Sequence, residues 1–247
     1  MAARDEIIAY LDELLDAPSF EDYGPNGLQV VGAADVTRVV TGVSAHLELF
    51  ERAAAIGAQM VLCHHGILWN KQPLVVDSQR RARLEALFDA DMSLAAYHLP
   101  LDAHPEVGNN ALICEGLGLE RGEQFADVGF VGRYTAPVPL EEFVDRCRRA
   151  FDREPLAFPH GPDPVSSVGV ISGGAASSLA EAADLGLDAF VTGEPSEPGM
   201  ADARERGITF VAGGHWATET FGVRRLGELL AERFGVEHEF VAIPNPV

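Results

Sequence analysis

The chain alternates between amphipathic helix patterns and short apolar, β-branched runs, and it does so in two successive series. In the first series we expect, in order, helix 5–16, strand 37–43, helix 46–56, strand 59–63, helix 79–90, strand 93–97 and helix 109–117. In the second we expect strand 127–134, helix 139–152, strand 167–172, helix 175–185, strand 188–192, helix 199–206, strand 208–212, helix 219–234 and strand 238–243. This alternation predicts an α/β fold.

The two series superimpose on each other. A shift of 129 residues, which places Gly57 on Gly186, lays the strand of residues 60–63 over that of residues 189–192. A shift of 117 residues, which places His98 on His215, brings Asp102 onto Glu219. We interpret this as an internal duplication that gives two similar α/β lobes, residues 1–123 and 124–247, with an approximate boundary and terminal segments that can exchange between lobes.

Histidines and acids follow three of the expected strands, at the carboxyl ends where ligands gather in α/β sheets. These residues are His64 and His65 after strand 59–63, His98 and Asp102 after strand 93–97, and His215 and Glu219 after strand 208–212. Imidazole with carboxylate suits zinc, iron, manganese, nickel or cobalt. Six groups exceed what one ion takes from a protein, so we expect two divalent ions about 4 Å apart that share a carboxylate.

Each of these residues also has a structural interpretation. A single histidine at a strand end is more often a hydrogen-bonded core group than a ligand; Asp102 suits a turn or cap, and Glu219 suits a helix N-terminus. The glycines in "ISGGAAS", Gly173 and Gly174, fit a structural turn better than a phosphate cradle. Cys63 would be a nucleophile only in a protein without the metal. We assign structural roles to the remaining histidines, His46, His104, His160 and His238.

The net charge of −20 over 247 residues, with Lys71 as the only lysine, argues against binding to nucleic acids or anionic membranes. It suggests a halophilic origin, with an acidic surface adapted to high salt. The N-terminus has an acidic amphipathic pattern and no 18-residue apolar run occurs, so we expect a cytoplasmic protein. The cysteines Cys63, Cys114 and Cys147 show no Cys-x-x-Cys spacing, which argues against a disulfide framework or thiolate site.

Four motifs together resemble the family of NIF-three-like dinuclear metal-centre proteins, the GTP cyclohydrolase 1 type 2 homologues. They are "PNGLQV", "CHHGILW", "HLPLD" followed by "GNN", and "GGHWATE". The resemblance covers essentially the whole chain, in the short form without an inserted domain. Leu99 departs from the threonine that the family often has, but the neighbouring His98 and Asp102 are kept.

The resemblance implies a toroidal homo-hexamer, a trimer of dimers, with a two-metal site between the lobes. It assigns His65 and Asp102 to one metal, His64 and His215 to the other, and Glu219 to both. His98 would be a catalytic or auxiliary residue beside the metals that shuttles a proton. The implied reaction is attack of a metal-activated hydroxide on a nucleotide heterocycle such as that of GTP, with release of formate.

Two functions therefore remain open. One is a dinuclear metal-dependent hydrolase that acts on a nucleotide or a related heterocycle. The other is a metal-binding, metal-handling or scaffold protein that binds ions and partner proteins without turnover. Nothing in the sequence identifies guanine or a triphosphate, and an acidic protein needs metals or a few arginines to attract such an anion.

Overall fold

The computed structural model describes residues 1–247 as a mixed α/β protein. The chain forms two compact units: residues 1–101 with 222–243, and residues 102–221 with 244–247. The chain crosses from one unit to the other within α4 (Leu99–Ala103) and within α10 (Thr220–Phe234). The lobe boundary expected near residue 123 describes the sequence repeat and stays a prediction. None of the helices combines the length and the hydropathy needed to cross a lipid bilayer.

The first unit is built on a five-stranded sheet in the order β13-β4-β5-β6-β2. Its strands are β2 (Gly27–Val30), β4 (Arg38–Ser44), β5 (Met60–His65), β6 (Ser93–Ala96) and β13 (Glu237–Phe240). All neighbours are parallel except β2, which runs antiparallel to β6. A separate two-stranded ribbon joins β1 (Ala2–Ala3) to β3 (Asp35–Val36).

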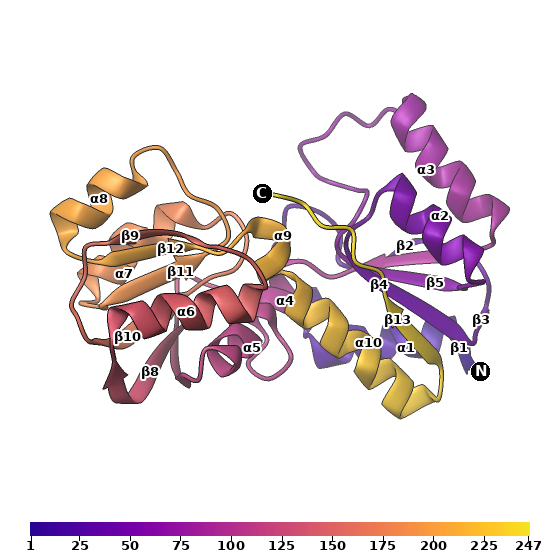
Figure 1. Ribbon diagram of the computed structural model, residues 1–247. Coiled ribbons are helices and arrows are strands. Elements are labelled where there is room, and N and C mark those ends of the chain that lie inside the picture. The colour runs from indigo at the N-terminus through magenta and orange to yellow at the C-terminus, as the bar shows by residue number, and fades with distance from the viewer. The chain divides into compact units, whose positions relative to one another are not determined.

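Helices cover both faces of this sheet, with α2 and α3 on one face and α1 and α10 on the other (Figure 1). The remaining bounds in this unit are α1 (Arg4–Leu14), the 3-10 turn η1 (Ala17–Ser19), α2 (Leu47–Ala55) and α3 (Ser78–Asp89). Leu49 and Phe50 of α2 are fully enclosed against Val40 and Val61 of the sheet. Strands buried on both faces explain why β4 and β5 read as continuous apolar runs.

The second unit has a six-stranded sheet in the order β7-β8-β10-β11-β12-β9. Its strands are β7 (Glu120–Phe125), β8 (Gly129–Val138), β9 (Leu156–Pro159), β10 (Val165–Val170), β11 (Ala189–Thr192) and β12 (Thr209–Ala212). The central strands β10, β11 and β12 are parallel, and the flanking pairs are antiparallel.

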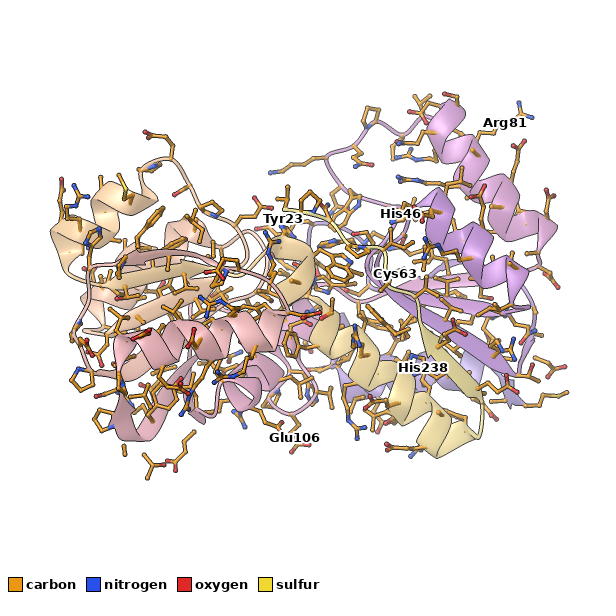
Figure 2. All side chains as sticks on the ribbon, in the orientation of Figure 1. Tyr23, His46, Cys63, Arg81, Glu106 and His238 are labelled. Atoms are coloured by element: carbon orange, nitrogen blue, oxygen red, sulfur yellow. The ribbon has the colours of Figure 1, made fainter.

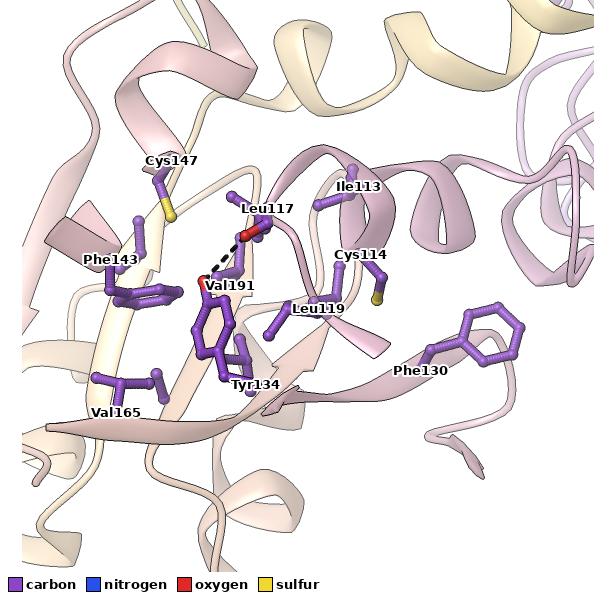
Figure 3. Close-up of a cluster of buried hydrophobic side chains, with 14 of the residues drawn as sticks. Ile113, Cys114, Leu117, Leu119, Phe130, Tyr134, Phe143, Cys147, Val165 and Val191 are labelled. Carbon is purple, nitrogen blue, oxygen red and sulfur yellow. Dashed lines mark hydrogen bonds between the residues drawn. The ribbon is translucent and has the colours of Figure 1, made fainter. Parts of the chain in front are cut away.

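Two hydrophobic clusters lie in this second unit. One packs α5 (Asn109–Gly116) and α6 (Leu140–Phe151) against the sheet, where the Tyr134 hydroxyl donates to the Leu117 carbonyl at 3.1 Å (Figure 3). The other contains Leu179, Phe190 and Phe210. The other helices here are η2 (Ala176–Ser178), α7 (Leu179–Asp184), α8 (Gly199–Arg206) and α9 (His215–Thr218).

Each of the eight strands expected from the sequence overlaps a strand of the structure, namely β4, β5, β6, β8, β10, β11, β12 and β13, and the α/β class is confirmed. The short antiparallel strands β2, β7 and β9 were not expected. The single helix expected over 219–234 is wrong at its start, because α9 ends at Thr218 and α10 begins at Thr220, with Glu219 between them.

Candidate metal site

His64 and His65 are the last two residues of β5, so they lie inside the strand and not beyond its end as expected. His65 is paired with Ser44 at the end of the parallel neighbour β4. The His64 ring is fully buried and that of His65 is partly exposed. Their centroids are nevertheless 4.7 Å apart, so both imidazoles face the same small region at the carboxyl edge of the sheet.

His98 joins this pair from the neighbouring strand. It follows β6, which is parallel to β5, so both strands end at the same edge of the sheet. The His98 ring centroid lies 4.9 Å from that of His64 and 5.5 Å from that of His65. One nitrogen of each imidazole lies within 4.8 Å of the other two. Three imidazoles at this spacing form a group that can hold a divalent ion.

In each of the three rings, the Nδ1 atom lies within hydrogen-bonding distance of a group of the first unit. The Nδ1 of His64 lies 3.0 Å from the Tyr97 carbonyl, which can only accept a hydrogen bond, so Nδ1 carries the proton and Nε2 the lone pair. The Nδ1 of His98 lies 2.7 Å from the Asp22 carboxylate, and that of His65 lies 3.1 Å from the Ser44 hydroxyl. Partners of this kind orient metal-binding histidines and fix their tautomer.

Asp22 comes close to His98 because β2 runs antiparallel to β6. Gly27 at the start of β2 pairs with Ala96 at the end of β6, which brings the preceding loop to the carboxyl edge. The Asp22 side chain is 1% exposed, and it also accepts hydrogen bonds from the backbone N–H of Leu99 and the amide of Asn26. Burial opposes its ionisation, but these hydrogen bonds and the His98 charge outweigh burial and lower the pKa of Asp22 to about 2.

Asp22 is a residue that the sequence reasoning missed. The motif "PNGLQV" was quoted there for the family resemblance, and Asp22 lies three residues before its first residue, Pro25. The sequence feature that could have pointed to Asp22 is its place directly before the turn residues of "YGPNGLQV". Asn26 of that stretch accepts a hydrogen bond from the His98 backbone N–H at 2.8 Å, so the loop positions His98 through two side chains.

The glycine that follows the two histidines, Gly66, has a steric reason. Its backbone needs no positive φ, but a Cβ there would lie 2.3 Å from the Gln29 amide. That amide accepts from the Ile67 N–H at 2.9 Å and donates to the Pro25 carbonyl at 2.8 Å. Gly66 therefore makes room for the side chain that ties the two loops together.

The second unit holds His215 and Glu219 at the end of β12. His215 begins α9, and its Nε2 lies 3.0 Å from Glu219 Oε1. Its Nδ1 is hydrogen-bonded to Glu194, which follows β11. Burial disfavours the imidazolium, but the two carboxylates outweigh burial and raise the pKa of His215 to about 9. Glu194 was not proposed from the sequence, although the 129-residue shift places it opposite His65.

Asp102 is also in the second unit, within α4, and its side chain is buried. Its Oδ1 accepts hydrogen bonds from the Asn109 amide at 2.8 Å and from the Ser172 hydroxyl at 3.0 Å. Ser172 follows β10, next to Gly173. The parallel strands β10, β11 and β12 thus place Ser172, Glu194 and His215 at one edge, as in an α/β ligand site.

Gly173 is crowded by the acid beside it. It has φ +66°, and a Cβ at this position would lie 2.3 Å from Glu219 Oε1 and 3.3 Å from His215 Nε2. The close approach supports a structural turn at Gly173 and Gly174, because a phosphate there would face a carboxylate.

Two of the histidines set aside in the sequence, His238 and His104, are hydrogen-bonded within the fold. His238 on β13 shares a hydrogen bond of 2.8 Å with Thr41 (Figure 2). The His104 Nδ1 accepts from two backbone N–H groups at 3.1 Å. Cys63, Cys114 and Cys147 are buried thiols, and burial raises the pKa of Cys63, which makes it a poor nucleophile.

These features define the class: an α/β protein with an imidazole cluster at a sheet edge that can bind a divalent metal ion. The family model described as Duf34/NIF3 (NGG1p interacting factor 3) matches residues 2–246. The chain belongs to this family.

Named relatives share this length and fold. The chain is 42% identical over 250 residues to a Pseudomonas aeruginosa protein named GTP cyclohydrolase 1 type 2 homolog, covering 99% of this chain and 98% of the relative. An Escherichia coli protein of the same name is 40% identical over 242 residues, with 98% of each chain covered. Among solved structures, the protein ybgI of unknown function has a TM-score of 0.96 at 40% identity, and TTHA1606 from Thermus thermophilus has 0.92 at 36% identity, both over the full length of each chain.

Proposed function

We propose that this protein is a dinuclear divalent-metal-dependent hydrolase of the GTP cyclohydrolase 1 type 2 kind, which opens a nucleotide heterocycle with release of formate. The observation that carries the proposal is the cluster of His64, His65 and His98, with one nitrogen of each within 4.8 Å of the others, which is close enough for His64 and His65 to serve two neighbouring ions with His98 beside them. The relatives' names supply the reaction class. The donor set supplies the metal class, because neutral imidazoles suit zinc, iron, manganese, nickel and cobalt.

The residues present fit such ions. Two ligands of one tetrahedral zinc ion lie roughly 3.4 Å apart when the bonds are about 2.1 Å long. The separation of 3.0 Å between His215 Nε2 and Glu219 Oε1 is close to that value. In the proposal His65 and Asp102 hold one ion, His64 and His215 hold the other, and Glu219 bridges both. Bound ions of this kind supply Lewis acidity and lower the pKa of bound water.

The protein's own groups have three tasks in this proposal. The Tyr97 carbonyl and Glu194 orient His64 and His215 through their Nδ1 atoms. The Asn109 amide and Ser172 hydroxyl fix the Asp102 carboxylate. His98 exchanges a proton with the substrate at its Nε2, and Asp22 orients the ring through Nδ1. Asp22 is therefore a positioning residue.

The proposal includes the duplication and the assembly. Both units place three parallel strands in chain order next to an antiparallel edge strand: β4, β5, β6 with β2, and β10, β11, β12 with β9. This shared order supports an internal duplication. We propose a homo-hexamer built as a trimer of dimers, which light scattering after size exclusion tests directly.

The function is tested by metal analysis of the purified protein together with formate release from GTP, before and after chelation. Two ions per chain with turnover that chelation abolishes and metal restores supports the hydrolase. Tight metal binding without turnover across a panel of nucleotides contradicts it and favours a metal-binding or scaffold role.

A further inference from the structure

A cavity of about 420 Å³ lies in the first unit and is formed by the segment that leaves β5 together with the start of α3. This volume is within the range of small-molecule pockets. It is lined by Ile67, Gln72, Pro73, Val75, Asp77, Gln79, Arg80 and Arg83. Its walls are therefore the loop after the histidines and the first turns of α3.

One segment of the chain, Gly66 to Trp69, contributes residues both to this cavity and to the surroundings of the imidazole cluster. Gly66, Leu68 and Trp69 line a small hollow together with His64 and His98. Ile67, which lies between them in the sequence, lines the larger cavity. The Trp69 ring stands edge-on to His98 at 5.3 Å, and its Nε1 donates to the Gly66 carbonyl at 3.1 Å. The same four-residue segment thus contributes to both spaces.

The charge in the cavity is opposite to that of the protein. The chain has 18 basic and 38 acidic residues, but residues 66–89 contain four basic residues, Lys71, Arg80, Arg81 and Arg83, and three acidic ones. Two arginines and one acid line the cavity, and the acid, Asp77, is engaged as the N-cap of α3, where it accepts from the Arg80 N–H at 2.8 Å. An anion is repelled by most of this surface and attracted here.

The two arginines have different surroundings. Arg80 donates to the carbonyls of Pro73 and Val75 at 2.9 and 2.7 Å and so fixes the loop. Arg83 is partly buried beside His46, where burial and then the Arg83 charge lower the pKa of that histidine. Arg81 does not line the cavity; its side chain is 73% exposed and paired with Glu85 (Figure 2).

We propose that this cavity binds the phosphate groups of the substrate, with Arg83 as the main charged contact and Arg80 holding the loop in place. This inference rests on the proposed function and assigns a binding site to the phosphate groups of its nucleotide substrate. Arginine is suited to the task because its planar guanidinium bonds phosphate oxygens in pairs.

The test measures binding of inorganic triphosphate by calorimetry to the full chain freed of metal with a chelator and then dialysed, so that bound ions cannot supply the affinity. Three variants each lower the net charge by one: Arg83→Gln, Gln79→Glu and Arg81→Gln. We expect the first two to weaken binding by roughly tenfold to a hundredfold. Arg81→Gln, on the outer face of the same helix, should bind like the wild type.

Equal affinity of all three variants, or no binding by the wild type at millimolar triphosphate, overturns the proposal. Gln79 is exposed, so Gln79→Glu keeps the test valid if Arg83→Gln fails to fold. With GTP as substrate, Arg83→Gln should raise KM at unchanged kcat. If Arg83→Gln and Gln79→Glu weaken triphosphate binding, Arg81→Gln does not, and no nucleotide is turned over, the phosphate site is supported and the hydrolase is contradicted. Failure of this proposal is therefore distinguishable from failure of the proposed function.

Discussion

Asp22 and His98 are joined by a 2.7 Å hydrogen bond between a carboxylate that is almost fully enclosed and an imidazole at the end of β6, 76 residues further along the chain. The same carboxylate caps the Leu99 N–H. One acid therefore fixes both the ring of His98 and the backbone of the next residue, Leu99.

The Asp22→Asn variant tests this contact through pH. The folded-state pKa of Asp22 is lowered from 3.8 to about 2, so its ionised form stabilises the fold above pH 4, and this contribution is lost as the pH falls toward 2. We expect Asp22→Asn to lower the free energy of unfolding at pH 6, with a difference from the wild type that shrinks by pH 2.5 in urea titrations. Asp89→Asn, at an exposed position of α3, should show no such difference. A gap that is constant with pH would contradict the assignment.

His215 gives a pH dependence of opposite sign in the metal-free protein. Its pKa is raised from 6.5 to about 9, so the charged imidazole between Glu194 and Glu219 stabilises the fold below pH 6.5, and this contribution is lost as the pH rises through 9. The stability advantage of the wild type over His215→Asn should therefore decline between pH 6.5 and pH 9.5. An advantage that grows with pH would show that the imidazole is neutral in the fold.

Glu219→Gln tests the proposed bridge between the metals. The amide keeps the size of the side chain but lacks the charge needed to hold two ions, so metal analysis should find the stoichiometry reduced from two to one or none per chain. His104→Ala, which removes a histidine whose Nδ1 accepts two backbone N–H groups, should keep the wild-type stoichiometry. Full occupancy in Glu219→Gln would refute the bridging role.

Gly173→Ala and Gly186→Ala separate crowding from backbone strain. Both glycines have positive φ, +66° and +70°, but a Cβ meets Glu219 Oε1 at 2.3 Å only at Gly173, and nothing within 4 Å at Gly186. Each substitution should cost about 1–3 kcal/mol in unfolding free energy from strain. Gly173→Ala should in addition displace Glu219 and reduce metal binding. Equal metal binding by the two variants would show that Glu219 tolerates the displacement.

The sequence predicted the parts of the fold that depend on local pattern. Strands β4, β5, β10 and β11 are apolar runs buried on both faces, and such runs are visible without any partner. The edge strands β2 and β9 were missed because "GLQV" and "LAFP" are short and lack alternation. Their role depends on pairing with a neighbour, which one sequence does not show.

The same limit applies to the candidate site. His64, His65 and His98 could be grouped because all three lie at the carboxyl ends of neighbouring strands in the same parallel series. Asp22, Glu194 and Arg83 could not be singled out in a chain with 38 acidic and 18 basic residues, because only their positions in space distinguish them from solvated surface charges.

The pairing of β13 with β4 has a consequence for synthesis. Arg38 and Glu237 are register partners 199 residues apart, so at about 5–20 residues per second a ribosome needs roughly 10–40 s to deliver the partner strand. During that interval the nascent chain carries β4 with one edge unpaired, and unpaired edges promote association between chains. Truncation just before β13 should therefore yield a polypeptide that depends on chaperones and aggregates when they are depleted.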